Sequence, residues 1–263
     1  MGEICVGTSG FSYDDWLGHF YPQDMVKASM LPFYAGRFRC VEINATYYTP
    51  PSSRMIQSFL ARTPAHFRFA IKAHKEITHE PAAGEGKGDL FQVFRSALAP
   101  LLEAGKLGTI LLQFPYAFRP VSENVSYLEE VVERLAWAPL TVEFRNARWV
   151  TKETLSLLRR LGVAFCCVDE PRLRGLMPPV AEATASLAYV RFHGRNAEKW
   201  WEHEQAYERY DYLYSQAELR EWLDKIRALA QACEKVFVFF NNHYQGKAAI
   251  NAQQMLELLG LEQ

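Results

Sequence analysis

The sequence predicts a single-domain (β/α)8 barrel, or TIM barrel, in which eight parallel strands form a closed ring inside a layer of helices. Eight short apolar runs rich in β-branched and aromatic residues recur along the 263 residues. The runs are almost continuously apolar, as expected for strands buried on both faces of a parallel sheet. Amphipathic segments separate most of them, and about 250 residues is the usual size of such a barrel. We therefore expect one domain over residues 1–263.

The eight apolar runs define the expected strands. In chain order they are 4–9, 40–44, 67–72, 109–114, 140–144, 163–169, 187–193 and 235–242. A doubly wound open sheet is the alternative arrangement, and it should carry a glycine-rich phosphate loop after an early strand. The stretch GTSG at 7–10 is too short for that motif, so the closed barrel is the better interpretation.

Helix start and stop signals lie between the strands. Ser52, Asp89 and Thr151 are placed to cap helices that follow them, and Gly162 suits a left-handed residue at a helix end. Ser215-Gln-Ala-Glu has the spacing of a capping box before a helix that continues to about residue 231, and a last helix is expected within 248–260. The sixth crossover, 171–186, contains three prolines and is expected to be irregular, without a helix.

Composition excludes some classes of protein. The formal net charge is -1, which gives no global attraction to nucleic acid or to an anionic membrane. No apolar run approaches the roughly 20 residues that span a bilayer, and the first residues carry no basic segment. The five cysteines lack paired CxxC spacing, so reduced core cysteines are expected. The predicted protein is soluble and cytoplasmic, with no membrane partner and with nucleic acid an improbable one.

Polar residues collect where the predicted strands end. They are Ser9, Glu42, Asn44, Lys72, Gln113, Glu143, Arg145, Asp169, Arg191, His193, Asn241 and Asn242. In a TIM barrel these carboxyl ends form the active site. Glu42/Asn44, Glu143/Arg145 and Arg191/His193 have i, i+2 spacing, so each pair is expected on one side of its strand. The pattern predicts a polar ring at the barrel mouth, although such charges can also be structural ion pairs inside a barrel.

Two long loops add candidates. His79 lies in the loop after the third strand and could reach the mouth, whereas the glycine-rich Gly84–Gly88 stretch lacks the spacing of a phosphate loop and is interpreted as mobile surface. The segment 195–214 begins with Arg195 and contains two tryptophans and four tyrosines. These aromatic side chains could form a lid over the site or could simply attach the excursion to the barrel.

Seven blocks of sequence resemble the YecE-like family, domain of unknown function 72. They are GTSGFSYDDW (7–16), VEINATYY (41–48), FAIKAHKEITH (69–79), LLQFPYAF (111–118), EFRNARW (143–149), RFHGR (191–195) and FFNNHYQGKAAINA (239–252). The resemblance covers the chain and implies a TIM barrel, but it implies no activity. Phe11 stands where the family usually has Trp, and Tyr116 where it usually has a second proline. The motif positions include most of the polar ring, together with His79 and Arg195.

The first functional hypothesis is an enzyme acting on a small anionic, phosphorylated or sugar-like substrate. Lys72, Arg145 and Arg191 would hold the anion, with Arg195 and His79 as further contacts. Glu42, Glu143 and Asp169 would share acid–base catalysis with His193. Asn44, Gln113, Asn241 and Asn242 would orient hydroxyls or a developing oxyanion.

Two other hypotheses remain open. Glu42, Glu143, Asp169 and His193 could bind a divalent metal in an isomerase or phosphodiesterase, although three cations in the same ring oppose this. Alternatively, the ring could belong to a ligand- or nucleic-acid-binding module that catalyses nothing. The sequence specifies no cofactor and no oligomeric state.

Overall fold

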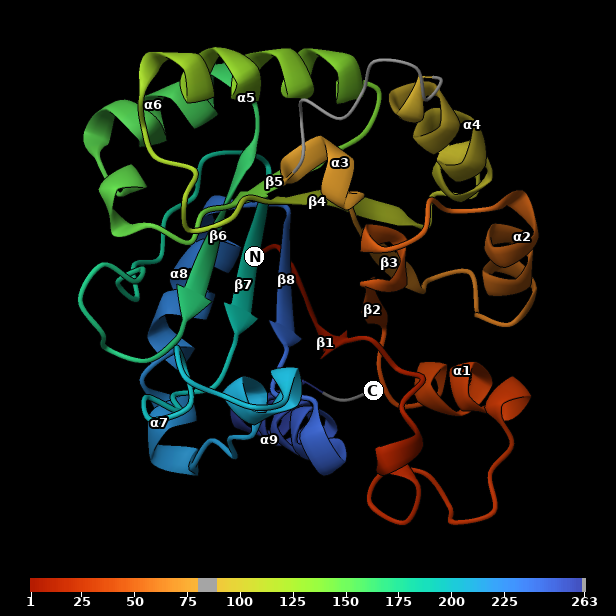
Figure 1. The fold of residues 1–263 in the computed structure, drawn as a ribbon. Helices are drawn as coiled ribbons and strands as arrows, with labels where there is room; N and C mark the ends of the chain where they lie inside the picture. Colours follow the sequence, from red (N-terminus) through yellow and green to blue (C-terminus); the bar gives the residue numbers. More distant parts are fainter. Residues whose placement is uncertain (80–88, 262–263) are drawn as a thin grey trace.

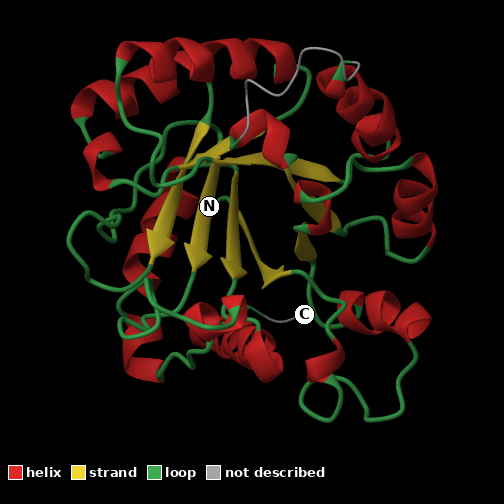
Figure 2. Cartoon of the chain, viewed as in Figure 1, coloured by secondary structure: helices red, strands yellow, loops and turns green. Residues whose placement is uncertain are grey.

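The strands close into one parallel barrel in chain order, with helices around the outside (Figures 1 and 2). The computed structural model describes residues 1–79 and 89–261, and within them it contains eight strands and nine α-helices. The strands are β1 (Glu3–Ser9), β2 (Cys40–Ile43), β3 (Arg68–Lys72), β4 (Leu107–Gln113), β5 (Leu140–Glu143), β6 (Ala164–Asp169), β7 (Leu187–Phe192) and β8 (Lys235–Phe240). β8 pairs with β1 to complete the ring. The predicted TIM barrel is confirmed.

The helices occupy most of the expected crossovers. They are α1 (Lys27–Ala35), α2 (Ser53–Ala61), α3 (Lys75–Thr78), α4 (Leu90–Glu103), α5 (Ser122–Leu135), α6 (Lys152–Leu161), α7 (Gln216–Arg220), α8 (Leu223–Ala232) and α9 (Lys247–Leu259). No helix lies between β6 and β7, so the irregular sixth crossover is also confirmed. The predicted Gly84–Gly88 loop lies outside the described residues.

Local signals place the helix ends. The side chains of Ser52, Asp89 and Thr151 accept backbone N–H groups at the starts of α2, α4 and α6, and Ser215 forms a capping box with Glu218. Gly162 ends α6 with φ 68°, in the left-handed region that glycine tolerates. The single helix expected from Ser215 was wrong, because the chain forms two helices, α7 and α8, that meet at the buried Trp222.

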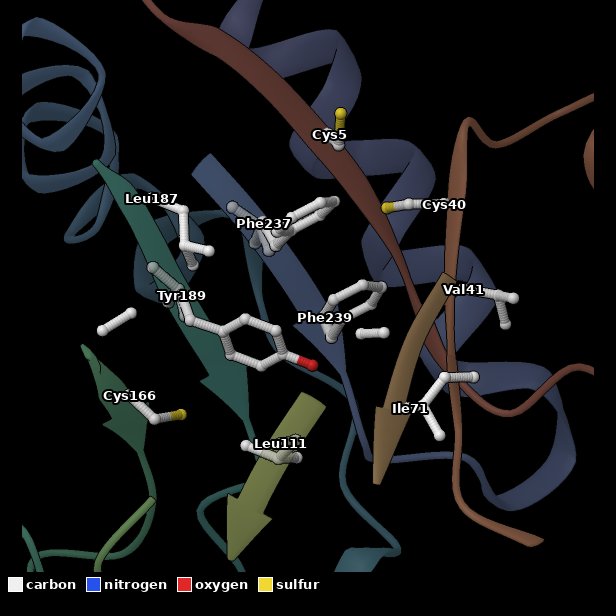
Figure 3. Packing of buried hydrophobic residues seen from close by; sticks show 14 of the residues in the cluster. Cys5, Cys40, Val41, Ile71, Leu111, Cys166, Leu187, Tyr189, Phe237 and Phe239 are labelled. Carbon is white, nitrogen blue, oxygen red and sulfur yellow. The ribbon is translucent and has the colours of Figure 1, made fainter. Parts of the chain in front are cut away.

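Large side chains fill the barrel interior below the mouth. Tyr189 projects from β7 beside Phe237 and Phe239 of β8 (Figure 3). The ring of Phe237 reaches across to β4, where a Cβ on Gly108 would lie 2.6 Å from it, so any side chain at this position would displace the ring. The interior is therefore packed up to the level of Tyr189, and the polar groups lie above it. In the part of the chain that the structure covers, no helix is both long and apolar enough to cross a bilayer.

Candidate functional site

A cavity of about 320 Å³ opens at the carboxyl ends of the strands. Lys72 and Gln113, the last residues of β3 and β4, contribute to its wall, and Arg145 joins them from the turn after β5. The loop after β7 contributes further lining residues. The complete lining among the described residues is Tyr47, Tyr48, Lys72, His79, Gln113, Pro115, Tyr116, Arg145, Leu176, Trp200, Trp201, Arg209 and Tyr210. A cavity at this end of a barrel is where TIM-barrel enzymes have their active sites.

Lys72 has an unusual environment for a lysine. Its Nζ donates to Gln113 Oε1 at 2.7 Å and lies 4.3 Å from the centre of the Tyr47 ring. Among the described residues, no carboxylate lies within ion-pair distance of this amine. Burial, followed by the charges of Arg191 and Arg145, lowers the pKa of Lys72 to about 7. Near neutral pH, Lys72 is therefore divided between the charged and the neutral form.

Two arginines provide permanent positive charge in the same cavity. Arg145 pairs with Glu143, with 2.6 Å between Nε and Oε1, although the geometry is not that of an aligned hydrogen bond. Arg209 Nε donates to the carbonyl oxygen of Trp200, and its guanidinium lies over the Trp200 ring. His79 lines the cavity as predicted, next to the Tyr47 ring. Lys72, Arg145 and Arg209 thus line the cavity, whereas Glu143, the partner of Arg145, does not.

Below the cavity, five buried side chains form a charge network. Arg191 bridges two carboxylates, with Nη1 2.5 Å from Glu143 Oε2 and Nη2 2.7 Å from Glu42 Oε1. Tyr189 donates to the other Glu42 oxygen at 2.7 Å, and His193 Nε2 lies 3.2 Å from Glu143 Oε1. The predicted meeting of Glu42, Glu143, Arg191 and His193 is therefore present, but as a layer beneath the cavity.

This network holds Glu143 and His193 in fixed ionisation states. Burial alone would raise the pKa of Glu143, but Arg145 and Arg191 outweigh it and hold that pKa well below its usual range. Burial and the charge of Arg145 lower the pKa of His193 to about 3. Asn241 donates from Nδ2 to His193 Nδ1 at 3.1 Å, which assigns the imidazole proton to Nε2. At neutral pH the group contains an ionised Glu143 and a neutral His193.

Glu170 is a further buried carboxyl group that the sequence analysis missed. One oxygen accepts the N–H of Met177, and the other, Oε2, has no hydrogen-bond partner among the described residues and lies 3.7 Å from Arg145 Nη1. Burial raises the pKa of Glu170 to about 7. The alternation of side chains along a strand could have identified Glu170 from the sequence. Glu170 lies on the same side of β6 as Cys166, whose Sγ contacts Glu143.

Asp169 and Arg195 do not join the cavity, contrary to the expectation of one polar ring. They form a bidentate pair at 2.8 and 2.7 Å on the outside of the barrel, where Asp169 also accepts from Tyr214 and Trp222. Cys167 is on the same side of β6 and contacts Glu182 outside the barrel. The expectation counted only strand ends, and Asp169 is one residue out of phase with the inward-facing positions.

Two asparagines are also displaced from the predicted ring. Asn44 has helical backbone angles and leads into a 3-10 turn, Ala45–Tyr47, so the alternation that begins at Glu42 stops before it. Its side chain lines a separate apolar cavity with Phe11 and Phe59. Asn242 faces outward and donates to Asn251 of α9 at 2.8 Å. Neither side chain lines the cavity that contains Lys72.

The positions of these side chains bear on the hypothesis of a bound divalent metal. Across the described ranges, no cluster of three or more His, Cys, Asp or Glu side chains is placed to hold a metal ion. The space between Glu42 and Glu143, where a metal ion would lie, is occupied by the guanidinium of Arg191.

The aromatic loop after β7 both attaches itself to the barrel and covers part of the cavity. Trp200 is buried, whereas Trp201 is 51% exposed and touches Tyr116 at the cavity edge.

Comparison with known proteins places the chain in a family. Residues 5–263 match the family described as "Protein of unknown function DUF72". The UPF0759 protein YunF of Bacillus subtilis (strain 168) is 34% identical over 98% of this chain and 95% of its own length, and the UPF0759 protein YecE of Escherichia coli (strain K12) is 31% identical over 44% of this chain and 39% of its own length. The crystal structure of a DUF72 family protein from Thermotoga maritima MSB8 superposes with a TM-score of 0.90, 42% identity and coverage of 98% and 99% of the two chains. The family resemblance seen in the seven sequence blocks is confirmed, and the chain belongs to the DUF72 family.

Proposed function

We propose that this protein is an enzyme that binds a small anionic substrate at the barrel mouth and acts on it by proton transfer. The observation that carries the proposal is the positive charge of the side chains that line the cavity. Lys72, Arg145 and Arg209 line the cavity, and none of its described lining residues is a carboxylate. A site built in this way attracts an anion, although the net charge of the whole chain is -1.

The cavity also limits the size and shape of the substrate. Its volume, about 320 Å³, lies at the small end of ligand sites in proteins. Tyr47, Tyr116, Trp200 and Tyr210 contribute aromatic side chains to its walls. A guanidinium binds carboxylate or phosphate through two parallel hydrogen bonds, and aromatic faces pack against sugar or other flat surfaces. These features favour a phosphorylated or carboxylated metabolite over a polymer.

Lys72 is the proton-carrying group in this proposal. A general acid or base works best when its pKa is near the working pH, and that of Lys72 is about 7. Glu143 and His193, which the sequence analysis favoured, have pKa values held far from neutrality. We assign Glu143, with Glu42 and Arg191, a supporting role as the charged groups that position Arg145 and set the potential at Lys72. His193 is a neutral hydrogen-bond partner of Glu143 in this network.

Ligand-induced stabilisation tests the proposal directly. A panel of phosphorylated sugars and small carboxylates would be screened by thermal shift, with product formation followed by NMR. A true ligand at a hundredfold excess over its Kd should raise the Tm by roughly 5 °C or more. The shift should disappear in Arg145→Gln and persist in Arg159→Gln, a surface control. Stabilisation that survives Arg145→Gln would contradict the site, and binding without turnover would favour a binding module.

A further inference from the structure

We infer that Lys72 is an amine nucleophile that forms an imine with the carbonyl group of a small anionic substrate whose carboxylate or phosphate binds Arg145. This inference rests on the proposed function and specifies its substrate class. It requires three things of the structure: an amine that faces the cavity, surroundings that favour its neutral form, and an anion-binding group in the same cavity.

The first requirement is met by the position of the amine. Lys72 lines the cavity, and its Nζ donates one hydrogen bond at 2.7 Å to the neutral side chain of Gln113. The amide oxygen of Gln113 can only accept, so this contact fixes the direction of one N–H and leaves the nitrogen lone pair available. The ring of Tyr47, 4.3 Å from Nζ, limits access of water on another side.

The second requirement is met by the charges around Lys72. Its hydrogen-bond partner is uncharged, and the guanidinium groups of Arg145 and Arg191 oppose a positive charge on Nζ. The carboxylates Glu42 and Glu143 are already engaged by Arg191. An amine with a pKa of about 7 is half neutral at pH 7, whereas an ordinary lysine is neutral in roughly one molecule in a few thousand.

Arg145 meets the third requirement. It lines the same cavity of about 320 Å³, which fits a compound of a few carbon atoms with its anionic group on Arg145 and its carbonyl on Lys72. Nζ attacks the carbonyl carbon, the C–N bond forms and the carbonyl oxygen takes up a proton. The C–O bond then breaks, and the hydroxyl group leaves as water after taking up the second amine proton, so that the C=N bond of the imine forms. No electrons are gained or lost, so the step needs no oxidant or reductant.

Reductive trapping tests the imine in the full-length protein. The protein would be incubated at pH 7 with pyruvate or with dihydroxyacetone phosphate in the presence of sodium cyanoborohydride, and adducts would be located by peptide mass spectrometry. We expect labelling of Lys72 at least tenfold above that of Lys27 and Lys199, which are exposed surface lysines. The two probes distinguish a carboxylate from a phosphate as the anionic group. Lys72→Met should remove this adduct and leave surface labelling unchanged.

Controls separate failure of the imine from failure of the anion site. Lactate and glycerol 3-phosphate, which lack the carbonyl, would be tested for binding by saturation-transfer NMR. Binding of these analogues with no enrichment of the Lys72 adduct would overturn the imine and leave the proposed function intact. Absence of both binding and adduct would overturn both. In Arg145→Gln, labelling by acetaldehyde should fall only as far as the loss of the Arg145 charge raises the pKa of Lys72, whereas labelling by the anionic probes should fall at least tenfold further. An equal fall for acetaldehyde and for the anionic probes would overturn the role of Arg145.

Discussion

His193 Nε2 donates to Glu143 Oε1 across 3.2 Å, as a neutral imidazole beside an ionised carboxylate. A histidine next to a carboxylate commonly gains a proton, because the opposite charge favours the imidazolium form. Here, burial and the positive charge of Arg145, together with that of Arg191, outweigh Glu143. The pair is therefore a fixed hydrogen bond at neutral pH, and this distinguishes it from an acid–base couple that exchanges protons.

This assignment predicts that His193 does not titrate between pH 5 and 8. Two-dimensional 15N NMR of the imidazole should show a single neutral form protonated on Nε2 across that range. The native pKa of about 3 lies below the usual value of 6.5, so this histidine supports folding above pH 6.5 and loses that contribution as the pH falls toward 3. The loss is on the order of 1 kcal/mol per pH unit. An imidazolium spectrum at pH 6 would contradict the assignment.

Arg191 should be the most costly member of the network to remove. Arg191→Met would leave Glu42 and Glu143 buried without their shared cation, and breaking a buried ion pair in this way costs about 3–5 kcal/mol. Arg159→Met, which removes a surface pair with Glu182, should cost about 0–1 kcal/mol. Urea unfolding measures both. Adding Glu42→Gln and Glu143→Gln to Arg191→Met should recover part of the loss, and no recovery would argue against the charge network as its cause.

The fold was predictable from the sequence because each strand is a local apolar run and several helices, among them α2, α4 and α6, begin at a side-chain cap. The site was predictable in part. Strand-end position found Lys72, Gln113 and Arg145, which reach the cavity, but it could not separate Asp169 from Glu170 because the two differ only in phase along β6. The aromatic side chains of Trp200, Trp201 and Tyr210 reach the cavity because the long loop after β7 folds back across the mouth, which local sequence patterns do not specify.

Asp169 should behave as a structural residue, although the sequence analysis grouped it with the catalytic candidates. Asp169→Ala removes the acceptor for Arg195, Tyr214 and Trp222 and leaves buried donors unpaired, at a cost of about 2–4 kcal/mol. Because Asp169 does not line the cavity, the folded fraction should bind anions as the wild type does. Unfolding curves and ligand titrations measure the two effects. If Asp169→Ala lost anion binding without losing stability, Asp169 would have to be counted among the residues of the binding site.

The raised pKa of Glu170 predicts that the wild type and Glu170→Gln differ in stability by an amount that grows with pH. Its native pKa of about 7 lies above the unfolded value near 4.5, so the folded state binds the extra proton and becomes less stable as the pH rises from 4.5 to 7. Glu170→Gln removes this penalty. The variant should equal the wild type near pH 4.5 and exceed it by about 1–3 kcal/mol at pH 8. Glu129→Gln, at a surface pair with Arg160, should change stability by less than about 1 kcal/mol at either pH.

The lowered pKa of Lys72 predicts the opposite pH dependence, a contribution to stability that rises with pH. Its native pKa of about 7 lies below the unfolded value of 10.5, so between these values the unfolded chain binds a proton that the folded chain lacks. Stability therefore rises with pH across that window, and below pH 7 the folded protein must hold a charged amine in the cavity. Lys72→Met should be more stable than the wild type by about 1–4 kcal/mol at pH 6, with the difference shrinking toward pH 10.

Lys27→Met is the matched control, because Lys27 is an exposed lysine paired with Asp14 and its replacement should change stability by less than about 1 kcal/mol. Thermal unfolding at pH 6, 8 and 10 compares the two variants. A gain in stability at Lys72 accompanied by loss of anion binding is the signature of a residue kept for function at the expense of folding. If Lys72→Met instead lowers stability at pH 6, the amine is a satisfied cation in the fold, and it could serve neither as a proton carrier nor as a nucleophile near neutral pH.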